Sequence, residues 1–205
     1  MPDDLISEFR NLTGGRLKQT PSELQVCAAV VRAHAPRVFV EVGSWEGGTL
    51  FVYARCCAGP RPLVIAADGG RLGSGKKLAR TVELLRAEGV DAHWVRGDSH
   101  AAGTLAQVRD LLGGREVDFL HVDGDHSKKG VMQDWRTYGP LLRPGGLAAF
   151  HDILAKAPCY VRCAWPEIRD QGAAWCELVG PARPRTGSTC GIGLVWTHRN
   201  AEEGA

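Results

Sequence analysis

The sequence predicts an α/β fold built on a doubly wound, seven-stranded and mostly parallel sheet. Five short apolar runs typical of buried strands alternate with segments of helical periodicity, and this alternation favours parallel strands joined by right-handed crossovers. The runs span residues 38–42, 63–67, 92–95, 117–122 and 147–150. Two further runs, 175–179 and 192–197, are separated only by a connection rich in Pro, Gly and Arg. They predict an antiparallel strand pair at the C-terminal end of the sheet.

Helices are predicted before and between these strands. Thr20-Pro-Ser-Glu23 has the layout of a capping box with Pro at the first helical position, which predicts a helix from Pro21 to His34. Helical periodicity recurs in the segments that separate the strands, at 49–57, 81–87, 105–112 and 131–142. The Pro and two Gly residues after Arg143 end the last of these segments.

Length and composition favour one domain that acts on small molecules. A chain of 205 residues with 44% apolar content is long enough for one buried core, so we expect a single domain over 1–205, with an N-terminal helical segment (1–34) and a core (35–198). A net charge of +2 without a basic stripe argues against a nucleic-acid partner. The sequence has neither a signal-peptide layout nor an 18-residue apolar span, so a cytoplasmic protein without membrane contact is expected.

The seven cysteines form an odd, scattered set without C-x-x-C pairs, which predicts reduced and mostly buried thiols. Cys159 and Cys163 have the look of half a zinc site. No second pair of Cys or His at short spacing completes it, so a zinc site of that kind is not expected.

A glycine loop follows the first predicted strand. Glu41 and Gly43 end the strand, and Gly47 and Gly48 precede the next helix. The spacing G-x-x-x-G-G differs from the G-x-G-x-x-G loop that cradles a pyrophosphate, and a Glu before the first Gly suits a ligand with a cation or hydroxyl groups. The loop therefore predicts a nucleotide-type cofactor, with a plain tight connection as the alternative.

Each of the five parallel strands ends in or next to an acidic residue. Because ligands bind at the carboxyl ends of parallel strands, these residues are expected to share one site. A carboxylate at the second strand end can accept both hydroxyls of a ribose, and one at the third can accept an adenine amino group. The acids thus outline an adenosine; the alternative is that each Asp caps a helix. The strand-end residues are Glu41, Asp68, Asp98 with Ser99, Asp123 with Asp125 and His126, and His151 with Asp152.

With these motifs the chain resembles the class I S-adenosylmethionine-dependent methyltransferases over roughly residues 35–196. The segments 122–127 (VDGDHS) and 142–153 (LRPGGLAAFHDI) are similar, more narrowly, to the small enzymes of the cephalosporin hydroxylase and macrolide sugar O-methyltransferase group. The resemblance implies the Rossmann-like methyltransferase fold with S-adenosylmethionine as cofactor. It implies methionine contacts at Glu41, Gly43, Ser44 and Gly47, ribose contacts at Asp68, and adenine contacts at Asp98 and Ser99.

The resemblance also implies a divalent metal, Mg²⁺ or Mn²⁺, held by Asp123 and by the pair His151 and Asp152, with His126 as general base. The macrolide sugar enzymes have Glu where this chain has His151, and an imidazole favours Mn²⁺, Fe²⁺ or Zn²⁺ over Mg²⁺. Methyl transfer to oxygen requires that a hydroxyl lose its proton, which a metal and a base at Asp123 and His126 would promote.

The sequence therefore predicts methyl transfer to an oxygen of a small natural product, such as a sugar or phenolic hydroxyl. Trp165 is a candidate for the acceptor pocket, and a homo-oligomeric neighbour is a further candidate to complete it. The alternatives are metal-free methylation of nitrogen or carboxylate, and a non-catalytic binding scaffold. Gly70 to Lys77 nearly spells a P-loop, but Lys77 stands where Ser or Thr must reach Mg²⁺.

Overall fold

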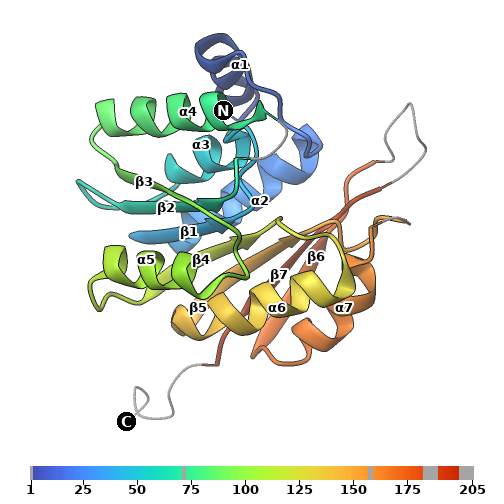
Figure 1. Cartoon of the computed structure of the whole chain (residues 1–205). Coiled ribbons are helices and arrows are strands. Elements are labelled where there is room, and N and C mark those ends of the chain that lie inside the picture. Colours follow the sequence, from blue (N-terminus) through green and yellow to red (C-terminus); the bar gives the residue numbers. More distant parts are fainter. Residues whose placement is uncertain (1, 71–72, 157–158, 182–188, 199–205) are drawn as a thin grey trace.

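A seven-stranded sheet in the order β3-β2-β1-β4-β5-β7-β6 lies between two layers of helices (Figure 1). The structure is a computed structural model and describes residues 2–70, 73–156, 159–181 and 189–198. The first five strands are parallel, and β7 runs antiparallel to both β5 and β6, which confirms the predicted fold class. The strands are β1 (Val38–Val42), β2 (Leu63–Asp68), β3 (Asp91–Arg96), β4 (Val117–Val122), β5 (Leu142–His151), β6 (Ala174–Leu178) and β7 (Ile192–Trp196).

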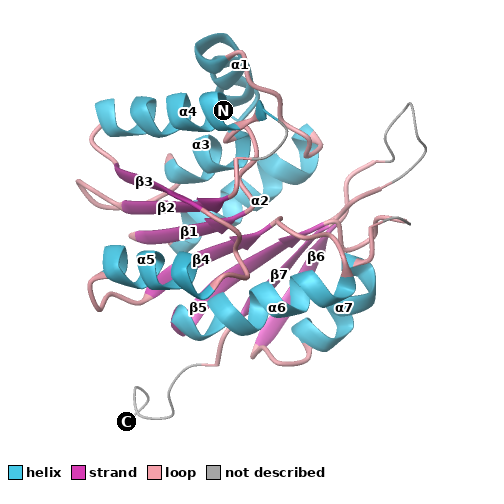
Figure 2. Ribbon diagram, in the orientation of Figure 1, coloured by secondary structure: helices cyan, strands magenta, loops and turns pink. Residues whose placement is uncertain are grey.

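The helices divide between the two faces of the sheet (Figures 1 and 2). One face carries α1 (Pro2–Thr13), α2 (Pro21–His34), α3 (Gly48–Ala54) and α4 (Gly75–Ala87). The other carries α5 (Ala102–Leu112), α6 (Lys128–Tyr138) and α7 (Val161–Arg169). None of the described helices has the length and apolar character needed to cross a membrane.

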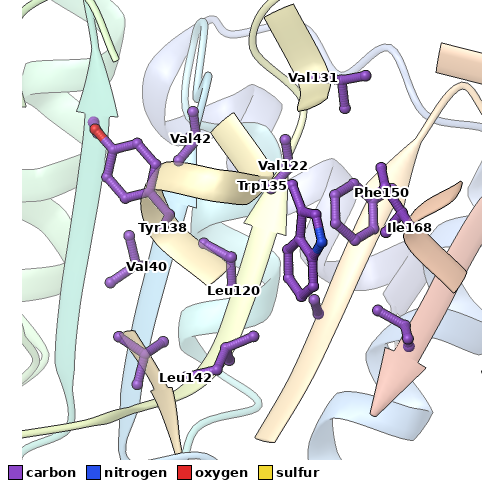
Figure 3. Close-up of a cluster of buried hydrophobic side chains, with 14 of the residues drawn as sticks. Val40, Val42, Leu120, Val122, Val131, Trp135, Tyr138, Leu142, Phe150 and Ile168 are labelled. Atoms are coloured by element: carbon purple, nitrogen blue, oxygen red, sulfur yellow. The ribbon is translucent and has the colours of Figure 1, made fainter. Parts of the chain in front are cut away.

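Alternate side chains of β1 belong to two separate hydrophobic clusters, one on each face of the sheet. Val38, Val40 and Val42 face α5 to α7, whereas Phe39 faces α2 and α3. Figure 3 shows the first cluster, in which valines of β1 and β4 meet aromatic side chains of α6. A strand buried on both faces explains why 38–42 is a continuous apolar run without alternation.

Trp165 of α7 belongs to this first cluster. Its ring lies 6.0 Å from that of Phe150, and its side chain is 2% exposed. The indole nitrogen donates to Glu177 over 2.7 Å. The expectation that Trp165 lines an acceptor pocket is therefore wrong, because its ring fills the space between α7 and the sheet.

Helix α2 begins and ends as the sequence predicts, but the predicted capping box does not form. Thr20 is the N-cap residue and makes no capping hydrogen bond through its side chain. Glu23 instead accepts the main-chain N–H groups of Gly180 and Gly191, over 3.2 and 3.0 Å. The residue is 1% exposed, and both donors reach its Oε1, so this oxygen is paired across the fold and not within the first turn of α2. The contact fixes α2 to the connection between β6 and β7.

Candidate active site

A cavity of about 730 Å³ opens at the carboxyl ends of the parallel strands. Its walls come from the turns that follow β1 to β5 and from residues 16–19, which connect α1 to α2. Most of the predicted site residues line it together: Gly43, Ser44, Asp68, Asp98, Ser99, Asp123, His126, His151 and Asp152. Glu41 and Gly47 are not among the lining residues. One cavity therefore joins the residues predicted for cofactor binding to those predicted for catalysis.

Gly43 allows the turn after β1 to pass close to the end of β4. Its φ is +83°, and a Cβ atom placed there would lie 2.4 Å from the carbonyl oxygen of Asp123. Its N–H donates to the carbonyl of Ala67 at the end of β2. Only glycine combines this conformation with this close approach. Trp45, two residues on, also adopts a positive φ of 48°, which is unusual for a large side chain.

Asp68 is fixed by two main-chain donors. Its Oδ2 accepts from the N–H of Trp45 over 2.9 Å, and its Oδ1 accepts from the N–H of Gly70 over 2.6 Å. Each carboxylate oxygen has a second lone pair that remains available to a ligand in the cavity. Asp68 thus orders the cofactor loop as well as lining the predicted ribose site.

Glu41 lies beneath the glycine loop rather than on the cavity wall. The side chain is fully buried, and its Oε1 lies 2.9 Å from Nδ1 of the equally buried His121 in β4. The ring of Tyr53 packs edge-on against the ring of His121. The methionine contact predicted for Glu41 stays a prediction, as does that for Gly47, which is the N-cap residue of α3.

Three residues that the sequence did not single out meet near the end of β3: His100, and Asp134 and Tyr138 of α6. His100 lines the cavity, and its Nε2 lies 3.1 Å from Oδ1 of Asp134, a fully buried residue of α6. Burial raises the pKa of Asp134 to about 6. The hydroxyl of Tyr138 donates to the carbonyl of Ser99 over 3.0 Å. An acidic residue on the apolar face of the predicted helix 131–142 was the only available signal for Asp134.

Two carboxylates and two imidazoles alternate around a ring at the ends of β4 and β5. Asp123 Oδ1 lies 3.3 Å from His151 Nδ1, and the same nitrogen lies 3.4 Å from Asp152 Oδ1. Asp152 Oδ2 lies 3.0 Å from His126 Nδ1, and His126 Nε2 returns to Asp123 Oδ1 at 3.5 Å. We call these four residues the Asp–His ring. Asp152 has a φ of +64°, so a non-glycine residue holds a strained conformation at the site.

The charges of the ring shift the pKa values of its members. The hydrogen bond to Asp152 raises the pKa of His126 despite partial burial. Burial alone would lower the pKa of His151, but the carboxylates of Asp123 and Asp152 outweigh it and raise the value. Burial opposes ionisation of Asp152 as well, and the hydrogen bond from His126 with the nearby His151 holds its pKa well below the usual range.

Residues 16–19, which we call the N-terminal strap, line the cavity. Gln19 Nε2 donates to Asp123 Oδ2 over 2.7 Å, a contact that nothing in the sequence signalled. The main-chain N–H of Arg16 donates to Glu46 over 2.6 Å, and Lys77 pairs with the same carboxylate at 3.2 Å. Lys77, at the position of the P-loop Ser or Thr, therefore contacts protein. Residues 71 and 72 of the P-loop-like segment lie outside the described residues.

Two cysteines, Cys159 and Cys190, lie beside the Asp–His ring. All seven cysteines of the chain are free thiols. Among the residues that the structure describes, two groups of three have ligand atoms within 4.8 Å of one another: His126, Asp152 and Cys159, and His151, Asp152 and Cys190. Cys163 belongs to neither group and is exposed. Asp123 also belongs to neither group, so its place in a metal site stays a prediction.

The fold and the cavity together define the class. A sheet with only β7 antiparallel, a glycine turn after β1 and acids at the next two strand ends is the arrangement expected of class I S-adenosylmethionine-dependent methyltransferases. Residues 40–153, more than half of the chain, match a family described as a methyltransferase domain. The chain belongs to this family.

Solved structures of other proteins share this fold, and one curated protein is similar in sequence. An O-methyltransferase from Bacillus cereus in complex with SAH superposes with a TM-score of 0.72 at 14% identity, covering 95% of this chain and 91% of that one. The O-methyltransferase TomG from Streptomyces achromogenes, involved in tomaymycin synthesis and in complex with SAM, gives 0.70 at 15% identity, with 97% and 91% covered. An uncharacterised protein of Acanthamoeba polyphaga mimivirus is 26% identical over 119 residues, 56% of this chain. The chain spans about half, 50%, of the length of that relative.

Proposed function

We propose that the protein transfers the methyl group of S-adenosylmethionine to a hydroxyl oxygen of a small natural product, such as a sugar or a phenol. One observation carries this proposal: a single cavity joins the predicted adenosine residues at the ends of β2 and β3 to the Asp–His ring at the ends of β4 and β5. The structural likeness to two O-methyltransferases, one of them a protein of tomaymycin synthesis, supports oxygen as the acceptor atom.

In this proposal the cofactor lies along the first three strand ends. Asp68 accepts the ribose hydroxyls, and Asp98 with Ser99 contacts the adenine. Gly43, Ser44, Gly47 and Glu41 surround the methionine part, with Gly43 making room for it by its missing side chain. This places the sulfonium methyl group toward the Asp–His ring, which lies at the next two strand ends.

His126 is the proposed general base. Asp152 Oδ2 lies 3.0 Å from His126 Nδ1. This contact orients the His126 imidazole and leaves its Nε2 to accept a proton. The acceptor oxygen attacks the methyl carbon in line with the sulfonium, the C–S bond breaks, and the hydroxyl proton passes to Nε2. The products are a methyl ether, S-adenosylhomocysteine and a protonated His126. Asp123, within 3.5 Å of Nε2, stabilises that positive charge.

The ring also fits a divalent cation. Its spacings of 3.3 and 3.4 Å around His151 Nδ1 are close to the separation of about 3.0–3.4 Å between ligand atoms that bind a cation at about 2.1 Å. Asp123, His151 and Asp152 would hold it. When bound, such a cation acts as a Lewis acid that lowers the pKa of the acceptor hydroxyl.

Calorimetric titration with S-adenosylmethionine tests the cofactor assignment. Asp98→Ala is the informative variant, because the Asp98 side chain is 56% exposed and its loss should leave the fold intact. The variant should bind about 10- to 100-fold more weakly than the wild type, the value of one or two hydrogen bonds to a charged group. Asp110→Asn, in the exposed part of α5, is the matched control and should bind normally. Failure of the wild-type protein to bind S-adenosylmethionine would refute the proposed function.

A methylation assay over a panel of phenols and sugars, with and without chelator, then tests the acceptor. Labelled methyl groups should appear in an alkali-stable ether. Transfer only to amines or carboxylates would contradict the choice of oxygen.

A further inference from the structure

The antiparallel strand β7 brings a cysteine to the end of β5. In the β5–β7 pair His151 lies opposite Ile192, so the residues just before β7 lie beside those just after β5. Cys190 is thereby placed next to Asp152, and its thiol hydrogen-bonds to that carboxylate. The main chain fixes the arrangement, because the N–H of Leu154 donates to the carbonyl of Cys190 over 2.8 Å.

His151, Asp152 and Cys190 present one ligand atom each within 4.8 Å of the others. Their exposed fractions are only 4%, 7% and 5%, so the three side chains have little room to move. The separation of 3.4 Å between His151 Nδ1 and Asp152 Oδ1 equals the edge of about 3.4 Å expected of a tetrahedral zinc site with bonds near 2.1 Å. The Cys190 thiol lies within 4.8 Å of a ligand atom of each of these residues, which makes a set of nitrogen, oxygen and sulfur.

We propose that His151, Asp152 and Cys190 bind a thiophilic divalent cation, preferably zinc, beside the cavity, so that Cys190 rather than Asp123 is the third ligand. A sulfur ligand selects zinc and similar ions against Mg²⁺, which takes oxygen ligands. His151 and Asp152 line the cavity, so a fourth position faces the space where an acceptor hydroxyl would bind. Three protein ligands with one open position are typical of catalytic zinc. The part played by the ion in methyl transfer rests on the proposed function, whereas the site itself does not.

The surroundings support these three ligands. Asp152 turns its Oδ1 to His151 and its Oδ2 to His126, so His126 acts as the outer partner that orients a ligating carboxylate. The residue after the thiol, Gly191, donates its N–H to the buried Glu23 over 3.0 Å, which fixes the loop before β7 from the other side.

The second group, His126 with Asp152 and Cys159, is the competing site. His126 is 46% exposed, against 4% for His151, so its ring is less firmly held. Ligation would also remove His126 from its proposed role as base. Pre-organisation therefore favours the group that contains Cys190.

Cobalt substitution tests the proposal with a signal independent of turnover. Metal-free protein titrated with Co²⁺ should develop a sulfur-to-cobalt charge-transfer band in the near ultraviolet, and zinc, but not excess Mg²⁺, should abolish it. Cys190→Ser should lose the band and bind zinc at least tenfold more weakly. Cys159→Ser is the matched control, a buried thiol beside the same carboxylate, and should keep the band. Loss of the band in Cys159→Ser and not in Cys190→Ser would overturn the assignment.

X-ray absorption of the zinc-loaded wild-type protein decides the question without any variant. One sulfur at about 2.3 Å with nitrogen and oxygen at about 2.0–2.2 Å is expected. A shell of nitrogen and oxygen alone would overturn the proposal. Calorimetry with S-adenosylmethionine on metal-free and zinc-loaded protein separates the zinc site from the proposed function. If the cofactor binds but zinc has no sulfur ligand, only the zinc site is refuted. If zinc binds through sulfur but the cofactor does not bind, only the proposed function is refuted.

Discussion

Asp134 is a fully buried acid of α6 whose replacement by Asn should change how stability depends on pH. Burial raises its pKa from 3.8 to about 6. The groups that face it are His100, with Nε2 at 3.1 Å, Ser99, and Asp125. Ser99, His100 and the main-chain N–H of Asp125 favour the ionised carboxylate, the side-chain charge of Asp125 opposes it, and the cost of burial exceeds their sum.

The sign and size of this change in the pH dependence of stability follow from proton linkage. Because the native pKa exceeds the unfolded one, the folded protein binds the extra proton between about pH 4 and pH 6, and stability falls as pH rises through that window. A shift of about two pKa units corresponds to about 3 kcal/mol, at about 1.4 kcal/mol per unit. Asn cannot ionise. The free energy of unfolding of Asp134→Asn, relative to that of the wild type, should therefore be about 3 kcal/mol higher at pH 8 than at pH 4. For a chain of 205 residues this is a relative rise in Tm of about 6–12 °C.

Urea unfolding of both proteins at pH 4, 5, 6, 7 and 8 measures the effect, because the difference between them cancels the titration of all other groups. Asp110→Asn, an exposed acid of α5, is the control and should follow the wild type at every pH. A wild-type-minus-variant difference that stays constant with pH, or that favours the wild type increasingly at high pH, would refute this reasoning about burial.

Three other substitutions give further expectations. Gly43→Ala should abolish S-adenosylmethionine binding by calorimetry, because the new Cβ would lie 2.4 Å from the Asp123 carbonyl and the φ of +83° disfavours alanine; tight binding would contradict the loop assignment. Arg143→Met should cost about 1 kcal/mol in urea unfolding at neutral pH, a modest value because Arg143 is 37% exposed. Arg143 and the main-chain N–H groups of Arg37 and Val38 together outweigh burial and lower the pKa of Asp118, so this cost should shrink as pH falls and Asp118 protonates; a cost that grows in acid would contradict it. Trp165→Ala should destabilise the fold by about 3–5 kcal/mol while the acceptor KM of the folded protein stays unchanged; a raised KM with normal stability would return Trp165 to the acceptor pocket.

Local patterns were sufficient to predict the sheet. Buried parallel strands need apolar residues on both faces, so continuous runs such as Val38–Val42 are visible in the sequence, and Pro21 fixes the start of α2 within one turn. The start of β5 was less visible. Its first residues, from Leu142 onward, include Pro and Gly, and the pairing of Leu142 with Val117 of β4, rather than local propensity, places them in the sheet.

The candidate site was predictable only where residues follow a strand in the chain. Asp68, Asp123 and Asp152 were found because the carboxyl ends of parallel strands meet at one edge. Gln19 and Cys190 were not found, because they reach the site from the strap and from the loop before β7, where no periodicity constrains them. The role of Glu23 was misjudged for the same reason: its capping position is a local signal, and its partners are 157 and 168 residues away.

The antiparallel direction of β7 explains how the two ends of the cavity are connected. A parallel strand brings its carboxyl end to the site, whereas an antiparallel strand brings its amino end, so the loop before β7 joins the turns after β4 and β5. Through Gly191 that loop binds Glu23 in the first turn of α2, and α2 follows directly on the strap that contacts Asp123 through Gln19. The strap that lines the cavity and the loop that carries Cys190 are therefore both attached to the N-terminal end of α2. Glu23→Gln should consequently weaken the binding of both S-adenosylmethionine and zinc, although Glu23 lines neither site, and an effect on one ligand alone would show that the two ends are not coupled through α2.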